Sequence, residues 1–361
     1  MRHGKNTIMG ALMERKIHTA AVTGCGRIGF TLGFDRKREQ PASHTMALLG
    51  NRSVRLVAGC DTDRARLEEW REYVSGRTGD VNTYTDAGRM MSAEKPEIAV
   101  IAVNENAHLK TALDIISYTP RLIILEKPVA LNMEQGLEIK TQAEKFGVAV
   151  AVNHERRFAD DYRAARNFMP EIGDVISVAA RLDSGMAVYR KSEAATGAYS
   201  LLHDGTHLVD AVQFLLGDKI HTESVRITAA EYVDGGNSVR TMRMQCSCDR
   251  CADISIAMSG KSRWFGFEID ITGTTGRVRI GNGIFGLYRR AESPFYTGFW
   301  SLLPDKSSKA PKRTGYFSNM VSNAVDFLDG RGGLLSTLDT GLDTLRVLEH
   351  TGNLLSAGRV D

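Results

Sequence analysis

The chain has 361 residues, enough for two domains, and its 42% hydrophobic and 25% charged residues are ordinary for a globular protein. With 46 Lys and Arg against 43 Asp and Glu, the net charge is +3, which favours neither nucleic acid nor a membrane surface as partner. Five cysteines, an odd number in a chain of this length, favour a reducing compartment and therefore a cytoplasmic location. The polar residues 1–17 are interpreted as a flexible leader.

Residues 18–152 alternate between apolar runs and segments with helical periodicity. This alternation predicts an α/β Rossmann domain with a parallel, doubly wound sheet, whose ligand lies beyond the carboxyl ends of its strands. The runs expected to form strands are 18–24, 55–61, 81–86, 97–103, 121–127 and 148–154, and the expected helices are 63–74, 107–118 and 132–146.

The pattern changes in residues 153–361, where strands follow one another without intervening helices. It predicts an α+β domain with a large, mostly antiparallel sheet. We expect a homo-oligomer that buries the uncovered face of this sheet. The expected strands are 225–233, 239–248, 253–260 and 265–273, the expected helices are 201–216, 317–328 and 338–355, and residues 305–315 are expected to form a mobile loop.

The first apolar run ends in the motif GCGRIG at residues 24–29. Gly24 permits a tight turn, Gly26 lets the backbone approach a pyrophosphate, and Gly29 allows close helix packing. The helix N-terminus that follows can bind the anion. The motif predicts a dinucleotide site, with Arg27 and Ile28 beside the cofactor.

Asp61 ends the second predicted strand and is expected to bind the adenosine ribose, which favours NAD. It follows Gly29 by 32 residues, where about 20 is typical, so we infer an inserted loop around residues 35–44. Basic Arg36, Lys37 and Arg38 in this loop could instead reach a 2′-phosphate, which leaves NADP possible.

Lys127 lies at the end of the fifth predicted strand, between Glu126 and Pro128. At that rim an ammonium can bind a substrate hydroxyl and stabilise the alkoxide that develops as hydride leaves. The alternative is a surface lysine with no such task.

His203 and His207 are four residues apart and share one face if the segment is helical. Either imidazole could act as general base. Two structural histidines, or a metal site completed by His154, are the alternatives; we expect no metal, since the HExxH glutamate is missing. The cluster Cys246, Cys248 and Cys251 is interpreted as structural thiols in a sheet.

Over nearly its whole length the chain resembles the Gfo/Idh/MocA family of oxidoreductases. The resemblance rests on motifs in the family's order, namely GCGRIG at 24–29, Asp61, VNENAH at 103–108, EKP at 126–128, ERRF at 155–158, DGTHLVD at 204–210 and TGTTGRVRIGNG at 272–283.

The resemblance implies an NAD(P)-dependent dehydrogenase that acts on a secondary alcohol of a sugar, polyol or nucleotide-sugar. It also implies that residues 153–361 bind the substrate and that their sheet builds a homodimer or homotetramer. It assigns catalysis to Lys127 and His207. His203 stands where the family usually has an aspartate, and we expect it to orient the substrate. A regulatory protein that binds NAD(P) and a sugar without turnover, and a redox-neutral enzyme that recycles NAD, are the alternative functions. Asn104, His108 and Glu126 are expected at the cofactor, and Arg157, Tyr199 and Asp204 at the substrate.

Overall fold

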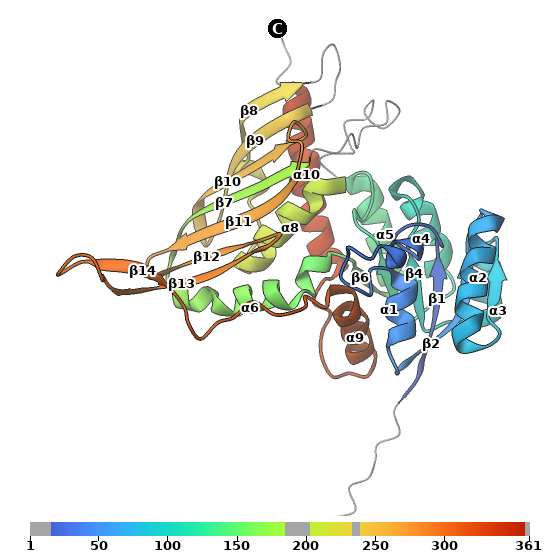
Figure 1. Ribbon diagram of the computed structural model, residues 1–361. Helices are drawn as coiled ribbons and strands as arrows, with labels where there is room; N and C mark the ends of the chain where they lie inside the picture. The colour runs from blue at the N-terminus through green and yellow to red at the C-terminus, as the bar shows by residue number, and fades with distance from the viewer. Residues whose placement is uncertain (1–15, 185–202, 233–238, 358–361) are drawn as a thin grey trace, which may run out of the picture.

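The computed structural model describes residues 16–184, 203–232 and 239–357, and Tyr199 and nearly all of the expected leader fall outside these ranges. Six parallel strands form the first sheet in the order β3-β2-β1-β4-β5-β6 (Figure 1). This is the predicted doubly wound sheet. Its strands are β1 (His18–Thr23), β2 (Val54–Cys60), β3 (Asn82–Tyr84), β4 (Ile98–Ile101), β5 (Leu122–Leu125) and β6 (Ala149–Val152).

Helices cover both faces of this sheet, which explains why β4 and β5 are apolar at every position. One layer combines α1 (His44–Gly50), α2 (Arg64–Thr78) and α9 (Tyr316–Leu328). The opposite layer combines α3 (Ala87–Glu94), α4 (His108–Ile116) and α5 (Met133–Phe146). Because α9 belongs to the C-terminal part of the chain, the two parts share a core.

The second sheet has eight strands in the order β14-β13-β12-β11-β7-β10-β9-β8. Neighbouring strands are antiparallel except β7 and β10, which are parallel, so the prediction of a mostly antiparallel sheet is confirmed. The strands are β7 (Val175–Ser184), β8 (Arg226–Tyr232), β9 (Val239–Cys248), β10 (Cys251–Ser259), β11 (Phe265–Gly273), β12 (Gly276–Gly281), β13 (Ile284–Glu292) and β14 (Trp300–Pro304).

Three helices, α6 (Asp160–Phe168), α8 (Gly205–Leu216) and α10 (Leu338–Ala357), pack on one face of the second sheet (Figure 1). The opposite face carries cross-strand ion pairs, including one between Arg277 and Asp270. Short 3₁₀ turns complete the fold: η1 (Thr31–Phe34), η2 (Glu105–Ala107), η3 (Glu155–Arg157), η4 (Met169–Ile172) and η6 (Thr222–Ser224).

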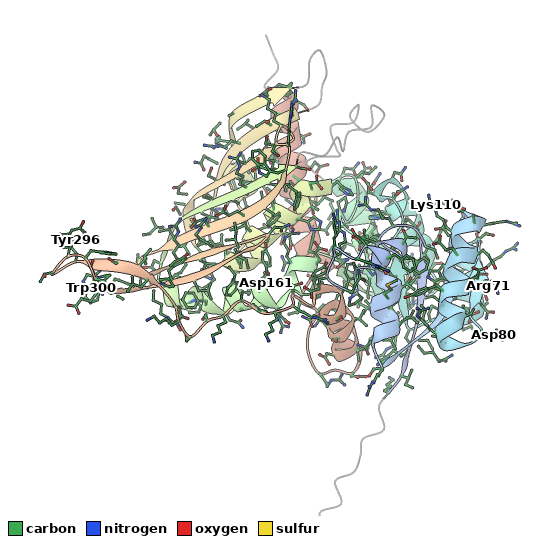
Figure 2. The ribbon with its side chains drawn as sticks, viewed as in Figure 1. Arg71, Asp80, Lys110, Asp161, Tyr296 and Trp300 are labelled. Carbon is green, nitrogen blue, oxygen red and sulfur yellow. The ribbon has the colours of Figure 1, made fainter. Side chains whose placement is uncertain are left out.

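The β13–β14 hairpin extends beyond the helices as an arm with aromatic side chains at its tip (Figure 2). Phe295, Tyr296, Phe299 and Trp300 are 76%, 69%, 66% and 60% exposed. Across residues 16–184, 203–232 and 239–357, no helix is long and apolar enough to cross a membrane.

Candidate functional site

The glycine motif forms the tight turn that its spacing predicts. Gly24 has φ +96°, and a Cβ there would lie 2.4 Å from the Ala102 carbonyl oxygen. At Gly29 a Cβ would lie 1.8 Å from the Gly24 carbonyl oxygen. At Gly26, by contrast, the nearest atom is the Arg66 guanidinium nitrogen at 3.6 Å. Two glycines are therefore required for packing, while the third leaves room for a diphosphate.

Asp61 closes the same turn from the carboxyl end of β2. Its Oδ2 accepts a hydrogen bond from the Cys25 amide at 2.8 Å, and its Oδ1 accepts one from the Asp63 amide at 2.9 Å. Asp63 in turn caps α2 by accepting from the amides of Ala65 and Arg66. These bonds fix the carboxylate beside the glycine turn, where a ribose would lie.

The inserted loop explains the long spacing between Gly29 and Asp61. Rather than one long helix, the glycine turn leads into η1 and then into a loop with exposed Arg36, Lys37 and Arg38. The helix resumes at α1, where the His44 amide donates to the Ile28 carbonyl at 3.1 Å and the Thr45 amide donates to the Gly29 carbonyl at 2.9 Å. The insertion thus leaves α1 docked on the glycine turn.

Lys127 lies directly after β5, and its Nζ donates a hydrogen bond to the His203 carbonyl at 2.9 Å. Burial lowers the pKa of Lys127, while the acidic neighbours Glu126, Asp204 and Glu155 raise it against that effect. The structure therefore brings the end of β5 and the start of α8 together, although they are far apart in sequence.

His207 lies on the first turn of α8 in this neighbourhood. Burial holds the pKa of its imidazole well below the ordinary value, and the nearby cations of Lys127 and Arg156 lower it further. The imidazole is consequently neutral at physiological pH and able to accept a proton.

His203 precedes α8 and faces the β4 rim. Its Nδ1 lies 3.7 Å from Oε1 of Glu105, and the interaction with His203 lowers the pKa of Glu105 to about 2 against the opposing effect of burial. Glu105 was missed in the sequence, although its position just after β4 on the ligand rim is a signal that could have revealed it.

Arg157 occupies a buried position rather than an open one. Its Nε donates to both carboxylate oxygens of Asp210, at 2.9 and 3.0 Å, and the two residues are 7% and 1% exposed. His154 Nδ1 lies 3.1 Å from the same carboxylate, and its Nε2 lies 3.0 Å from Thr206 Oγ1. The predicted substrate contact of Arg157 stays a prediction, since the observed contact is an ion pair that fixes η3 to α8.

The residues expected at the cofactor from the VNENAH segment lie just beyond β4. Asn104 precedes η2. His108 is buried, with Nδ1 2.8 Å from the Pro128 carbonyl and Nε2 3.1 Å from the Val103 carbonyl. His108 therefore joins the loops that follow β4 and β5, and its predicted cofactor contact stays a prediction.

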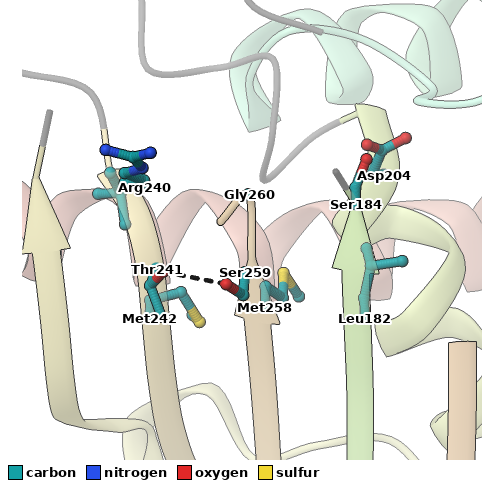
Figure 3. Close-up of a pocket in the computed structure, with 10 residues that line it drawn as sticks. Leu182, Ser184, Asp204, Arg240, Thr241, Met242, Met258, Ser259 and Gly260 are labelled. Carbon is teal, nitrogen blue, oxygen red and sulfur yellow. Dashed lines mark hydrogen bonds between the residues drawn. The ribbon is translucent and has the colours of Figure 1, made fainter. Parts of the chain in front are cut away.

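Asp204 borders a pocket at the edge of the second sheet (Figure 3). The pocket lies where β7 and β10 end and β9 begins, and Thr241 and Ser259 are hydrogen-bonded there at 3.1 Å. Asp204 thus links the Lys127 neighbourhood to the sheet. The wall comprises Leu182, Ser184, Asp204, Val239, Arg240, Thr241, Met242, Met258, Ser259 and Gly260.

The three clustered cysteines lie in the β9–β10 hairpin and are buried as free thiols. Burial raises the pKa of Cys246 to about 12 and that of Cys248 to about 11. Within the described ranges, no group of three or more His, Cys, Asp and Glu side chains is arranged to hold a metal ion.

The glycine turn, the acid after β2 and the strand order define a dinucleotide-binding Rossmann domain. Residues 19–154 match a family described as "Oxidoreductase family, NAD-binding Rossmann fold". Residues 19–154 thus match the NAD-binding Rossmann domain of the Gfo/Idh/MocA family, which is the family that the sequence motifs predict.

Among curated proteins, the chain is 29% identical over 225 residues to a protein of Amycolatopsis mediterranei with the provisional name UDP-kanosamine synthase oxidoreductase subunit. That match covers 60% of this chain and 57% of the relative. D-glucoside 3-dehydrogenase of Escherichia coli is 26% identical over 45% of this chain and 47% of its own. The chain thus spans about half the length of these relatives.

Among solved structures, the WlbA dehydrogenase of Chromobacterium violaceum, crystallised with NADH and UDP-GlcNAcA, matches with a TM-score of 0.75. The identity is 19%, and the match covers 96% of each chain. This likeness confirms the fold of both domains.

Proposed function

We propose that the protein oxidises a secondary alcohol of a sugar, polyol or nucleotide-sugar with NAD. One observation carries the proposal: the hydrogen bond from Lys127 Nζ to the His203 carbonyl, at 2.9 Å, joins the end of β5 to the start of α8, whose first turn carries His207. Removal of a hydroxyl proton requires a base that accepts the proton and a hydrogen-bond donor that stabilises the oxygen, both at one site.

The residues at the glycine turn fit the cofactor. The space at Gly26 admits a diphosphate, and the fixed Asp61 carboxylate can accept from ribose hydroxyls. When bound, NAD supplies the hydride acceptor. Asn104, at the end of β4, and Glu126, at the end of β5, lie on the same rim, where the nicotinamide half belongs in such sheets.

His207 accepts the proton from the substrate hydroxyl, because burial and nearby cations keep its imidazole unprotonated. Lys127 donates a hydrogen bond to the same oxygen and stabilises the negative charge that develops there. His203 orients the substrate. Its carbonyl accepts a hydrogen bond from Lys127, and its ring faces Glu105.

The substrate class is inferred from relatives whose names refer to D-glucosides, glucose 6-phosphate and myo-inositol. All three names describe molecules with a ring bearing adjacent secondary hydroxyls. Asp204, at the edge of the pocket in Figure 3, offers a carboxylate to such hydroxyls. Tyr199 and Arg157 remain predicted substrate contacts.

The test is a panel of glucosides, inositols and UDP-sugars, each incubated with the full chain and NAD while NADH absorbance and product are followed. We expect stoichiometric NADH and a keto product with at least one member. Product without net NADH would instead indicate recycling of the cofactor, and binding without product would indicate a regulatory protein. Either result would overturn the proposal.

We also propose that the protein forms a homodimer or homotetramer through the second sheet. The face of that sheet on which no described helix packs and the exposed aromatic tip of the arm support this assembly. A cytoplasmic location belongs to the same proposal, supported by five cysteines that are all buried free thiols.

A further inference from the structure

A buried carboxylate stands next to Lys127 and is held by residues from two other segments. Glu126 Oε1 accepts hydrogen bonds from His44 Nε2 and from Asn153 Nδ2, both at 2.6 Å. The exposed fractions of Glu126, His44 and Asn153 are 5%, 0% and 4%. A carboxylate this deep in the protein stays charged only if donors and a counter-charge compensate for its lost hydration.

The three side chains meet because their segments end at one rim. Glu126 follows β5 and Asn153 follows β6, and the Asn153 amide donates to the Leu125 carbonyl at 2.8 Å, which fixes the two strand ends together. His44 arrives from α1, whose first turn is docked on the glycine turn, and its ring packs edge-on against Phe317 with centroids 5.2 Å apart.

We propose that His44 is a positioning residue for the reaction: by holding Glu126 as a buried carboxylate, it keeps the adjacent Lys127 charged as an ammonium at the substrate oxygen. The inference rests on the proposed function, in which Lys127 must be protonated to stabilise developing negative charge.

The surrounding charges agree with this role. Burial raises the pKa of Glu126, but His44, Asn153 and the charge of Lys127 together outweigh burial and leave that pKa below its usual range. Glu126 heads the neighbours that raise the pKa of Lys127 against burial. The other charged or titratable groups that face Lys127 are Asp204, Glu155, Glu105 and His207.

Each variant needed for a test removes a different part of the contact between His44 and Glu126. E126Q removes the charge but keeps the size and the acceptor oxygen. H44F removes the donor but keeps a ring against Phe317, whereas H44Q keeps a donor near the position of Nε2. E97Q is the matched control, because Glu97 also pairs with a buried histidine, His18, but at the amino ends of β1 and β4 in the same sheet.

The measurement is the rate of Lys127 acetylation by acetic anhydride as a function of pH, read by peptide mass spectrometry on the folded full chain. Only the unprotonated amine reacts, so loss of a nearby negative charge speeds labelling at neutral pH. We expect labelling about tenfold faster in E126Q and at least about threefold faster in H44F. In H44Q and E97Q we expect rates within about twofold of wild type.

Unchanged labelling in folded E126Q would overturn the proposal, even if H44F fails to fold. Equal acceleration in E97Q would also overturn it, since the effect would then be a general loss of stability. Labelling needs no turnover, so absence of dehydrogenase activity refutes the proposed function and leaves this test intact. Conversely, if the enzyme is active but the labelling of Lys127 is unchanged in E126Q or H44F, only the proposed role of His44 is refuted.

Discussion

Replacing Arg157 by methionine would leave the buried carboxylate of Asp210 without its arginine partner. Arg157 donates to both oxygens of Asp210, which is 1% exposed, so solvent cannot replace the lost partner. Breaking a buried pair from one side costs about 3–5 kcal/mol. His154, 3.1 Å from the same carboxylate, remains as a partner and places the expected loss of unfolding free energy near the lower end, about 3 kcal/mol.

The pH dependence of the unfolding free energy distinguishes the effect of the lost charge in R157M from the effect of altered packing. In the wild type, burial raises the pKa of Asp210, but Arg157 and His154 outweigh it and leave the pKa lowered, so its stabilising effect is lost only as pH falls below about 4. In R157M the main opposing cation is gone and burial raises the pKa above its unfolded value. Protonation of Asp210 then removes the cost of burying its charge, so the difference in unfolding free energy between the wild type and R157M becomes smaller as the pH falls from 7 to 5.

Urea unfolding at both pH values, followed by tryptophan fluorescence, measures this gap. The double variant R157M/D210N serves as control and should regain at least about half of the lost stability, since no charge is left buried. A loss below about 1 kcal/mol, together with a raised KM for substrate, would refute the reasoning and return Arg157 to a substrate-binding role.

Two further predictions concern the site, and a third concerns the arm. D61A should raise the Kd for NAD about tenfold by removing the ribose acceptor and leave the Kd for NADP nearly unchanged, as measured by calorimetry; an unchanged ratio would show that Asp61 does not select the cofactor. Because the pKa of His207 lies well below its ordinary value, kcat should not fall as the pH drops through about 6.5. If kcat of the wild type does fall there, and the fall is absent in H207N, His207 is not an unprotonated base at this pH. Replacing Phe295, Tyr296 and Phe299 by serine should lower the mass seen by light scattering, whereas an unchanged oligomer would exclude the arm from the interface.

The sequence predicts those parts of the site that lie at ends of apolar strands. Gly24 and Asp61 follow β1 and β2, and Lys127 follows β5, so the rule for parallel sheets brings them to one rim. The first sheet was predicted for the same reason: strands covered on both faces are continuous apolar runs that a sequence shows clearly.

Contacts between distant segments could not be predicted this way. His44 reaches Glu126 across 82 positions, and Arg157 reaches Asp210 across 53. Nothing local marks His44 as a partner, because the insertion hides the continuity of its helix with the glycine turn. Glu105 differs, because its place just after β4 on the ligand rim is a signal that the sequence does contain.

Elements with weak burial patterns were missed as well. In α3 the buried residues are the adjacent Met90 and Met91, which give no helical repeat. Along β14 the exposed side chains Trp300 and Leu302 are apolar, so the usual alternation of apolar and polar residues is missing. Strand β7 alternates properly, yet its pairing in parallel with β10 depends on the three-dimensional fold rather than on its own residues.

The central claim is that the Lys127 ammonium stabilises negative charge on the substrate oxygen. It is tested most directly by the single-turnover rate of NADH formation in K127M, with the Kd for NAD measured on the same sample. We predict a rate about 10²–10³-fold below wild type with the Kd for NAD within about threefold. A wild-type rate in K127M would contradict the account.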